Sequence, residues 1–488
     1  MNTHDVIVIG GGAAGLTVAS GCAQLGMKTA VVEREHMGGD CLHYGCVPSK
    51  TLLHVASQFR NAAEVERFVA KRNGFPVELK PDMSAINSHV AGVVGEIAHH
   101  DSPERFRSLG AEVYLGAATF RSASEVEVDG NRLSARRIVI ATGSRAAIPP
   151  IPGLRETDYL TNRDMFSLTE LPRSIAVLGG GPIGVELSQA YRRLGSEVTI
   201  IEMAPRILPR DDDQLAAVVR TRLEKEGIHV LTGDAVTKVA AEGRKKVLTI
   251  GSGGHERTVE TEQVLVAAGR IANVDQLGLD SAGVALERGV VVVNDKMQSS
   301  VPHIYAIGDA NGRFPFTHVA GAEASAVVRR VALHAGGRVD YSKVPWVSYT
   351  DPELAGVGYT QASAEAAGIP CRTITQSFSA IDRAHAEEGT DGLIRIVLDR
   401  KDRVIGTGIV ARGAGELLGP ALHAVAGRWK LTRFRRALTP YPTMGEIYGR
   451  TVSNELSPKL FNRRTRSILR ALFRYRGTGP IEAPTEGA

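Results

Sequence analysis

A glycine-rich pattern that occurs twice constrains the fold of this chain more than any other feature of its sequence. Residues 4–33 read HDVIVIGGGAAGLTVASGCAQLGMKTAVVE, and residues 174–202 repeat the same order of strand, glycine turn, helix and strand. The copies lie 169 residues apart, and each has a glutamate 23 residues after its first glycine. Two copies at G-x-G-x-x-G spacing predict two dinucleotide-binding units. The residues concerned are Gly10, Gly12, Gly15 and Glu33 in the first copy and Gly179, Gly181, Gly184 and Glu202 in the second.

Each residue type in this pattern has a physical reason. The first glycine permits a tight turn, the second lets the backbone approach a pyrophosphate, and the third lets helix and strand pack closely. The N-terminus of the following helix offers unpaired N–H groups to the phosphates. Each glutamate accepts a hydrogen bond from a ribose hydroxyl, and Glu202 would repel a 2′-phosphate, which favours NADH. Arg206 would partly offset this repulsion, so NADPH stays an alternative.

The order of motifs predicts an α/β chain with two Rossmann-like domains, the second inserted in the first, followed by an α+β module. We expect a discontinuous first domain at 1–146 and 270–340, a second nucleotide domain at 147–269 and a C-terminal dimerisation module at 341–455. Strands are predicted at 137–144, 262–270 and 303–310, and long helices at 51–72 and 84–109. The remainder, 456–488, is expected to be a basic tail that is partly disordered.

Composition excludes several classes of protein. The chain has 488 residues, of which 43% are apolar and 23% charged, as in ordinary globular proteins. Four cysteines are too few for a secreted disulfide scaffold. We find no secretory signal and no apolar run long enough to span a membrane, so a cytoplasmic location is expected. The net charge of +5 is concentrated in the tail, so a nucleic-acid partner is not expected.

Two of the cysteines form a close pair in the stretch GGDCLHYGCVPSK, residues 38–50. Cys41 and Cys46 precede a predicted helix with Pro48 in its first turn, and a helix N-terminus lowers the pKa of a thiol. Their spacing lets the side chains face each other, which favours a disulfide that opens and closes in catalysis. A metal site and unpaired structural thiols are the alternatives. Cys22 and Cys371 each lie alone and are interpreted as structural.

Over residues 4–450 the chain resembles the flavoprotein disulfide reductases of the pyridine-nucleotide type, which include dihydrolipoamide dehydrogenase, glutathione reductase and mercuric reductase. The resemblance implies a homodimer that binds FAD at the first glycine motif and NAD(P)H at the second. Electrons would pass from the nicotinamide through the flavin to the Cys41–Cys46 disulfide, with Cys46 facing the flavin and Cys41 attacking the substrate. It also assigns cofactor contacts to Lys50, Gly116, Ala141, Thr142, Gly143, Asp309, Glu186 and Gly269. No resident metal is implied.

The chain departs from this family near its C-terminal end. Thiol reductases of this type carry His-Pro-Thr-x-x-Glu, whereas residues 439–446 read TPYPTMGE. Glu446 stays, but Tyr441 replaces the histidine that shuttles a proton, and a tyrosine is a poor base at neutral pH. Mercuric reductases resemble this chain at that position, yet they also carry a C-terminal cysteine pair, and no cysteine follows Cys371 here. His43 replaces an asparagine that is usual between the two cysteines.

The last residues form a basic amphipathic pattern. Residues 450–476 hold eight lysines and arginines and one acid, and 461–476 place apolar side chains opposite arginines on a helical wheel. Such a helix suits a docked dimer element, an anionic membrane surface on the cytoplasmic side, or an acidic partner.

These features together predict an enzyme that passes electrons from NAD(P)H through FAD and the thiol pair to a small disulfide or a metal ion. Dihydrolipoamide dehydrogenase activity and a membrane-surface diaphorase are the alternatives. The linear sequence does not name the electron acceptor.

Overall fold

The computed structural model describes residues 2–68, 79–252 and 255–477. The chain divides into two compact units, one made of Met1–Pro209 and Leu223–Tyr341 and the other of Arg210–Arg222 and Ser342–Ala488. Residues 69–72 of the predicted helix 51–72, and 478–488 of the tail predicted to be partly disordered, lie outside the described residues.

The first unit is built on two sheets, each of which begins with one of the glycine motifs. In the first sheet, the strand order is β3-β2-β1-β6-β5-β4, and β19 also pairs with β6. The pairs among β3, β2, β1, β6 and β19 are parallel, whereas β4 and β5 continue as an antiparallel extension. The strands are β1 (Asn2–Ile9), β2 (Thr29–Glu33), β3 (Ala111–Leu115), β4 (Ala118–Ser122), β5 (Glu125–Val128), β6 (Asn131–Ile140) and β19 (Ile304–Ala306).

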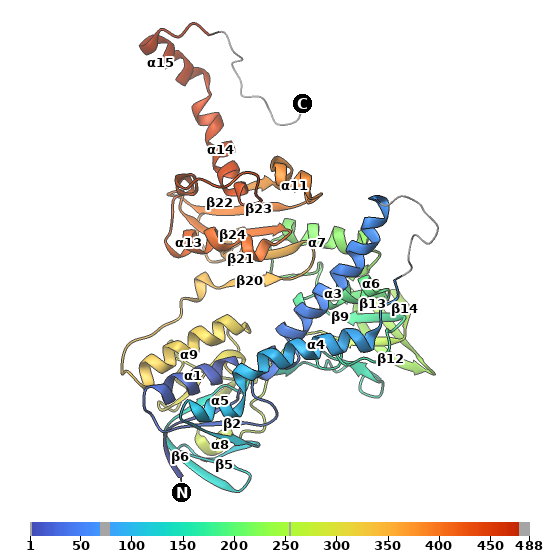
Figure 1. Cartoon of the computed structure of the whole chain (residues 1–488), viewed down its shortest axis with the longest axis vertical. Helices are drawn as coiled ribbons and strands as arrows, with labels where there is room; N and C mark the ends of the chain where they lie inside the picture. The colour runs from blue at the N-terminus through green and yellow to red at the C-terminus, as the bar shows by residue number, and fades with distance from the viewer. Residues whose placement is uncertain (1, 69–78, 253–254, 478–488) are drawn as a thin grey trace. The chain divides into compact units, whose positions relative to one another are not determined.

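Both faces of this first sheet are buried, which is why its central strand is almost continuously apolar. Val6 and Val8 of β1 pack in one cluster with helices α1 (Ala13–Gln24) and α9 (Thr317–Val331). Ile7 and Ile9 point to the opposite face, into a cluster with β4 and β5. Figure 1 shows α1 and α9 side by side against the sheet, although they are far apart in the sequence.

The second sheet is entirely parallel, with the order β11-β10-β9-β15-β8. Helix α6 (Pro182–Leu194) follows the second glycine turn. An antiparallel sheet of three strands, β12-β13-β14, lies between β11 and β15 in the sequence. The strands are β8 (Tyr159–Leu160), β9 (Ser174–Leu178), β10 (Glu197–Glu202), β11 (His229–Thr232), β12 (Ala235–Glu242), β13 (Lys245–Ser252), β14 (His255–Thr261) and β15 (Gln263–Val266).

The two ends of the segment that carries the second sheet meet in a short ribbon. Strand β7 (Ser144–Ala146) pairs antiparallel with β16 (Arg270–Ala272), so the chain leaves and re-enters the first region at neighbouring points. This pairing agrees with an inserted second nucleotide unit, and the exact domain boundaries stay a prediction. The remaining short elements of this unit are α2 (Gly39–His43), α8 (Leu279–Ala282), β17 (Leu286–Glu287) and β18 (Val290–Val291).

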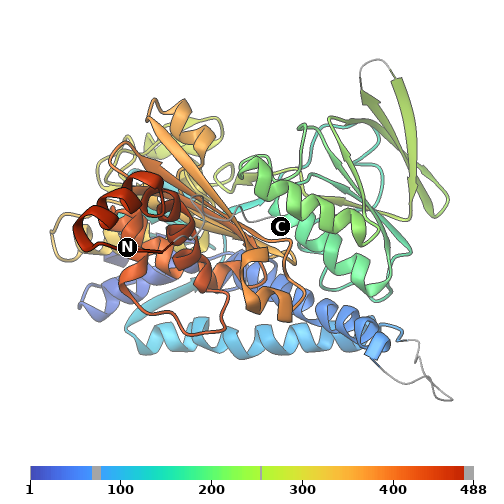
Figure 2. The same ribbon diagram turned by 90° about the horizontal axis from the view of Figure 1, so that it is seen from above.

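Helices α3 (Cys46–Val65) and α4 (Met83–Ala98) lie side by side, as the blue helices of Figure 2 show. The prediction of one helix over 84–109 is wrong, because the chain breaks after α4 and restarts as α5 (Pro103–Ser108). Pro103 occupies the first turn of α5, and the side chain of Ser102 caps it by accepting from the Arg105 N–H. A proline in the first turn starts a helix and disfavours helical backbone in the preceding residue.

The second unit is an antiparallel sheet with the order β20-β21-β24-β23-β22. Residues 210–222, which begin helix α7 (Asp213–Lys225), belong to this unit: the Trp346 indole N–H donates to Asp211 at 2.6 Å, and Arg395 pairs with Asp212 at 3.2 Å. The other elements are β20 (Pro345–Ser348), β21 (Glu353–Gly358), β22 (Cys371–Ser377), β23 (Leu393–Asp399), β24 (Val404–Ala411), α10 (Gln361–Ala366), α11 (Asp382–Ala386), α12 (Ala414–Leu417), α13 (Gly419–Ala426), α14 (Glu446–Leu460) and α15 (Arg463–Phe473).

Candidate active site

The first glycine turn leaves room for a ligand at one position only. A Cβ atom added to Gly10, whose φ is +110°, would lie 2.3 Å from the carbonyl oxygen of Ala141. One added to Gly15 would lie 1.8 Å from the carbonyl oxygen of Gly10. At Gly12 the nearest atom is the Cα of Gly39, 3.8 Å away. Packing therefore requires the first and third glycines, whereas the second borders open space beside the N-terminus of α1.

The second glycine turn has the same division of roles. Added Cβ atoms would lie 2.4 Å from the carbonyl oxygen of Ala267 at Gly179 and 2.0 Å from that of Gly179 at Gly184. At Gly181 no atom lies within 4 Å. Both turns thus keep an open approach at the glycine that caps the following helix, which is the geometry a pyrophosphate needs.

Each motif glutamate is fixed by two backbone N–H groups. Glu33 accepts from Gly11 N–H at 2.6 Å and Glu35 N–H at 2.7 Å. Glu202 accepts from Gly180 N–H at 2.6 Å and from Ala204 N–H at 2.8 Å. The carboxylates therefore stand at equivalent places beside the two glycine turns.

Arg206 points its guanidinium at backbone carbonyls within its own segment. It donates to the carbonyl oxygens of Leu208 at 3.0 Å and Pro209 at 2.9 Å. These two bonds fix the position of the guanidinium, which keeps its positive charge.

Three of the predicted flavin contacts, Thr142, Gly143 and Asp309, lie where the first sheet meets the β7–β16 ribbon. The Thr142 hydroxyl is buried and has no hydrogen-bond partner among the residues that the structure describes, as expected of a group that contacts a ligand. Asp309 accepts from the Ser144 hydroxyl, and the guanidinium of Arg270 lies 3.9 Å from the same carboxylate. Arg270 also donates to Asp40 at 2.8 Å, close to the thiol segment. Gly116, Gly143 and Gly269 all have positive φ.

Glu323 of α9 holds the turn that carries Asp309. Its buried carboxylate accepts from Gly308 N–H at 2.7 Å, the Asn311 side chain at 2.9 Å and the Tyr341 hydroxyl at 2.5 Å. Burial raises the pKa of Glu323. Sequence reasoning missed this residue, although a single acid flanked by alanines in AGAEASA, residues 320–326, is a visible signal that its carboxylate needs partners.

The two thiols of the predicted pair interact. Cys41 lies in α2 and Cys46 is the first residue of α3, so Cys46 stands at the positive end of a helix dipole. The hydrogen bond from Cys41, the charge of Lys50 and the hydroxyl of Thr317 lower the pKa of Cys46 to about 6. The same hydrogen bond, together with burial, raises the pKa of Cys41. The pair is thus asymmetric: Cys46 ionises first and Cys41 keeps its proton.

Two further predicted residues, 136 positions apart, form an ion pair beside the thiols. The Lys50 ammonium donates to the Glu186 carboxylate at 2.7 Å, and the side chains are 34% and 6% exposed. Thr317, at the start of α9, has its hydroxyl oxygen 3.8 Å from the Cys46 sulfur. Thr317 was not predicted, because nothing local in the sequence relates it to a cysteine 271 residues earlier.

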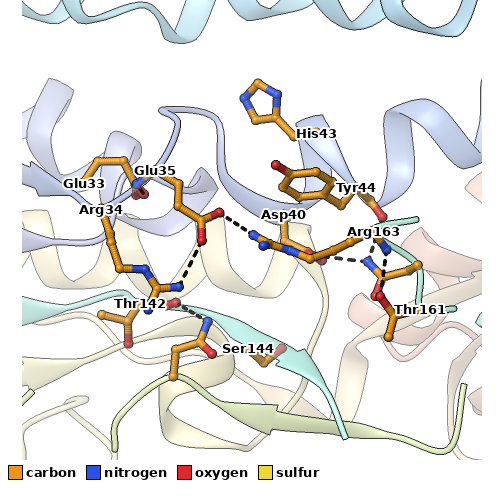
Figure 3. Close-up of polar contacts among 12 residues, drawn as sticks. Glu33, Arg34, Glu35, Asp40, His43, Tyr44, Thr142, Ser144, Thr161 and Arg163 are labelled. Carbon is orange, nitrogen blue, oxygen red and sulfur yellow. Dashed lines mark hydrogen bonds and ion pairs between the residues drawn. The ribbon is translucent and has the colours of Figure 1, made fainter. Parts of the chain in front are cut away.

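The thiol segment is tied to residues 161–163 by a polar cluster. Figure 3 shows Arg163 between Glu35, with which it forms an ion pair, and the Tyr44 ring, whose centre lies 4.3 Å from the guanidinium carbon. The bond with Arg163 lowers the pKa of Glu35. His43, which replaces the usual asparagine, hydrogen-bonds the carbonyl of Met37 at 2.9 Å, and so helps to fix the loop before Cys41.

Tyr441 and Glu446 lie in the second unit. The Tyr441 hydroxyl donates to the Asp382 carboxylate at 2.9 Å, and this bond raises the pKa of Tyr441. Glu446 accepts from Thr443 N–H at 3.1 Å. A phenol that donates to a carboxylate keeps its proton at neutral pH.

The other two cysteines stand in different surroundings. Cys22 lies in α1 and is completely buried in the core cluster that this helix shares with the first sheet, and burial raises its pKa to about 11. Cys371 starts β22 in the second unit, and burial raises its pKa as well. Over 2–68, 79–252 and 255–477, no three His, Cys, Asp or Glu residues are grouped to hold a metal ion. Within the same ranges, every helix is too short or too polar to cross a membrane.

Comparisons with known proteins agree with this geometry. Residues 4–324 match the family described as "Pyridine nucleotide-disulphide oxidoreductase", and residues 344–452 match its dimerisation domain. The chain is 34% identical to a mercuric reductase of Bacillus cereus over 446 residues, 91% of this chain and 70% of that protein. It is 36% identical to a dihydrolipoyl dehydrogenase of Thermus scotoductus over 454 residues, 91% and 96% of the two chains.

A solved structure, the Cu(II) complex of the HOCl-induced flavoprotein disulfide reductase RclA from Escherichia coli, superimposes with a TM-score of 0.82. The sequences are 25% identical, and the match covers 93% of this chain and all of the other. The predicted family and fold class are therefore confirmed: the chain belongs to the pyridine nucleotide-disulphide oxidoreductases, enzymes that carry FAD and use NAD(P)H.

Proposed function

We propose that this chain is a homodimeric FAD enzyme that oxidises NADH and reduces a soft metal ion through Cys41 and Cys46. The observation that carries this proposal is the asymmetric thiol pair, in which the pKa of Cys46 is lowered to about 6. In addition, Tyr441 replaces a histidine and keeps its proton. Residues 344–452, which match a dimerisation domain, support the dimer.

FAD would lie on the first glycine turn, with its pyrophosphate beside Gly12 and a ribose against Glu33. The unpartnered hydroxyl of Thr142 and the carboxylate of Asp309 supply polar contacts further along the cofactor. The residues present therefore fit this group. When bound, this cofactor would supply two-electron transfer between the nicotinamide and the Cys41–Cys46 disulfide.

The nicotinamide cofactor that we propose is NADH. The fixed carboxylate of Glu202 suits a ribose 2′-hydroxyl and repels a 2′-phosphate, and Arg206 donates to carbonyls of its own segment. We expect a higher kcat/KM with NADH than with NADPH, and a smaller ratio in Glu202→Gln. A wild-type preference for NADPH would contradict this assignment.

The thiol step balances as follows. The reduced pair, with Cys41 as the thiol and Cys46 as the thiolate, gives two electrons to a divalent ion such as Hg(II), forms its S–S bond and releases one proton to water. NADH then restores the thiol and the thiolate and leaves NAD⁺. Lys50 and Thr317 hold Cys46 as the thiolate, while Cys41 is the thiol that meets the acceptor.

The proton balance favours a metal ion over a disulfide as acceptor. Disulfide exchange must protonate the departing thiolate, a task that suits a histidine with a pKa near neutrality. Tyr441 donates to Asp382 and is a poor proton shuttle at this pH. A metal ion takes up electrons without a protonation step of this kind. The similarity to mercuric reductases and to a Cu(II)-complexed reductase also supports this acceptor class.

The test compares NADH-dependent reduction of Hg(II), Cu(II), lipoamide and glutathione disulfide by the FAD-loaded, full-length protein. We expect turnover with a metal ion to be fastest, and to fall to background in Cys41→Ala and in Cys46→Ala. Cys371→Ala is the matched control, since it removes a thiol from the second unit and should retain wild-type rates. Equal metal reduction with and without Cys41 would refute the thiol route.

Two other outcomes would select the alternatives. Lipoamide as the fastest acceptor would indicate a dihydrolipoyl dehydrogenase, and reduction of dyes or quinones alone would indicate a diaphorase. A cytoplasmic location is proposed with the thiol chemistry, because a catalytic thiol pair is kept cycling in a reducing compartment.

A further inference from the structure

Helix α15, Arg463–Phe473, presents an uncovered apolar face in the second unit. No residue of this helix is buried. Ile468, Leu469, Leu472 and Phe473 are 49%, 37%, 69% and 59% exposed, and their spacing places them on one side of the helix. Figure 1 shows α15 continuing beyond α14, away from the sheet of this unit. The family's dimerisation pattern ends at residue 452, before this helix begins.

The opposite side of α15 is strongly basic. Arg463, Arg466 and Arg470 lie there, and residues 456–477 contain no aspartate or glutamate. The first turns of α15 carry three arginines, Arg463, Arg464 and Arg466. The positive end of the helix dipole lies there and disfavours cations. These charges therefore weaken the isolated helix, and an anionic surface on this side of α15 would stabilise it.

A helix of 11 residues with no buried side chain has little stability of its own in water. Covering its apolar face would stabilise it. A second copy of α15 would bring two sets of arginines together at the contact, which is unfavourable. An anionic lipid surface instead offers acyl chains to the apolar side and phosphates to the arginines.

We infer that α15 is an interfacial anchor that lies in the headgroup region of an anionic bilayer, with its axis along the surface. Ile468, Leu472 and Phe473 would enter the boundary with the acyl chains, while the arginines contact lipid phosphates. The inference goes beyond the proposed redox function and does not depend on which acceptor the thiols reduce.

The test is co-sedimentation of the full-length, FAD-loaded protein with vesicles. Binding is expected with phosphatidylcholine vesicles that contain phosphatidylglycerol, and not with phosphatidylcholine alone. Each arginine near an anionic surface contributes about fivefold in affinity, so Arg466→Gln/Arg470→Gln should weaken binding about 25-fold. Arg244→Gln/Arg412→Gln, two exposed arginines elsewhere, is the charge-matched control and should bind like the wild type.

A second variant tests the apolar side without altering charge. Leu472→Ser/Phe473→Ser should lose most vesicle binding, and binding of the wild type should bring a gain in helical circular dichroism. Reduction of soluble acceptors should be unchanged in every variant. Absence of binding, equal binding to both vesicle types, or an equal loss in the control pair would each overturn the inference. If the wild type does not bind vesicles and Leu472→Ser/Phe473→Ser changes the oligomeric state, the apolar face of α15 contacts a second copy of the chain instead.

Discussion

Replacing Lys50 with methionine should raise the pKa of Cys46 by about one unit. In the folded protein this pKa is about 6, and the charge of Lys50 is one of the three causes that lower it, after the hydrogen bond from Cys41. A cation close to an ionisable group shifts its pKa by about 1 to 3 units. Because the Lys50 side chain is 34% exposed and partly screened by water, we take the lower end. The midpoint should therefore move to about 7.

The assay is the long-wavelength charge-transfer absorbance of the NADH-reduced, FAD-loaded protein, titrated over pH and normalised to its alkaline plateau. Thiolate is the absorbing form, so absorbance is lost as the pH falls through the pKa of Cys46. At pH 6.5 about three quarters of the wild-type band should remain, against about a quarter in Lys50→Met. The midpoint, rather than the amplitude, is compared, because the mutation also changes the surroundings of the ring.

Three variants control this measurement. Lys50→Arg keeps the positive charge and should stay near the wild-type midpoint. Glu186→Gln should move the midpoint down, because the Glu186 carboxylate raises the pKa of Cys46. Lys238→Met, an exposed lysine in β12, should change nothing. If Lys50→Met and Glu186→Gln shift the midpoint in the same direction, or not at all, electrostatic control of Cys46 by this ion pair is refuted.

Three further predictions concern Thr317, Glu323 and Gly12. Thr317→Val should raise the same midpoint by less than Lys50→Met does, since the Thr317 hydroxyl is the weakest of the causes that lower the pKa of Cys46. Glu323→Ala leaves three donors without their acceptor and should lower stability to urea by about 3 kcal/mol, whereas Glu323→Gln keeps an acceptor and should lose less. Gly12→Val should fold normally, as judged by circular dichroism, yet fail to retain FAD, because its side chain enters open space beside α1. Wild-type FAD content in Gly12→Val would contradict that assignment.

The parts of this fold that the sequence predicts are those set by local backbone requirements. Gly10 and Gly15 are needed because a Cβ atom there would overlap backbone carbonyl oxygens, and this need leaves the same trace in both motifs. The repeated motif therefore predicts two dinucleotide-binding units and their order along the chain. The break within 84–109 was also readable, since Pro103 disfavours helical backbone at Ser102.

Contacts between segments that are distant in the sequence could not be predicted from a local sequence pattern. Thr317 reaches Cys46 from a helix 271 residues later, and the Arg270 bond to Asp40 joins strand β16 to the thiol segment. Each depends on how sheets and helices pack, which no spacing rule encodes. The assignment of residues 210–222 to the C-terminal unit is similar, because it rests on Trp346 and Arg395 meeting acids from another part of the chain.

The asymmetry of the thiol pair also explains which acceptors need a base. Cys46 is already ionised at neutral pH, whereas Cys41, whose pKa is raised, must lose its proton before it can attack. With a disulfide as acceptor, that proton needs a base with a pKa near neutrality, and Tyr441 is held protonated by Asp382. A soft metal ion differs, because coordination by itself deprotonates a thiol. The metal ion would thus deprotonate Cys41, a task that a histidine at position 441 performs when the acceptor is a disulfide. The tyrosine at this position would therefore slow the reduction of disulfides and leave the reduction of metal ions unchanged.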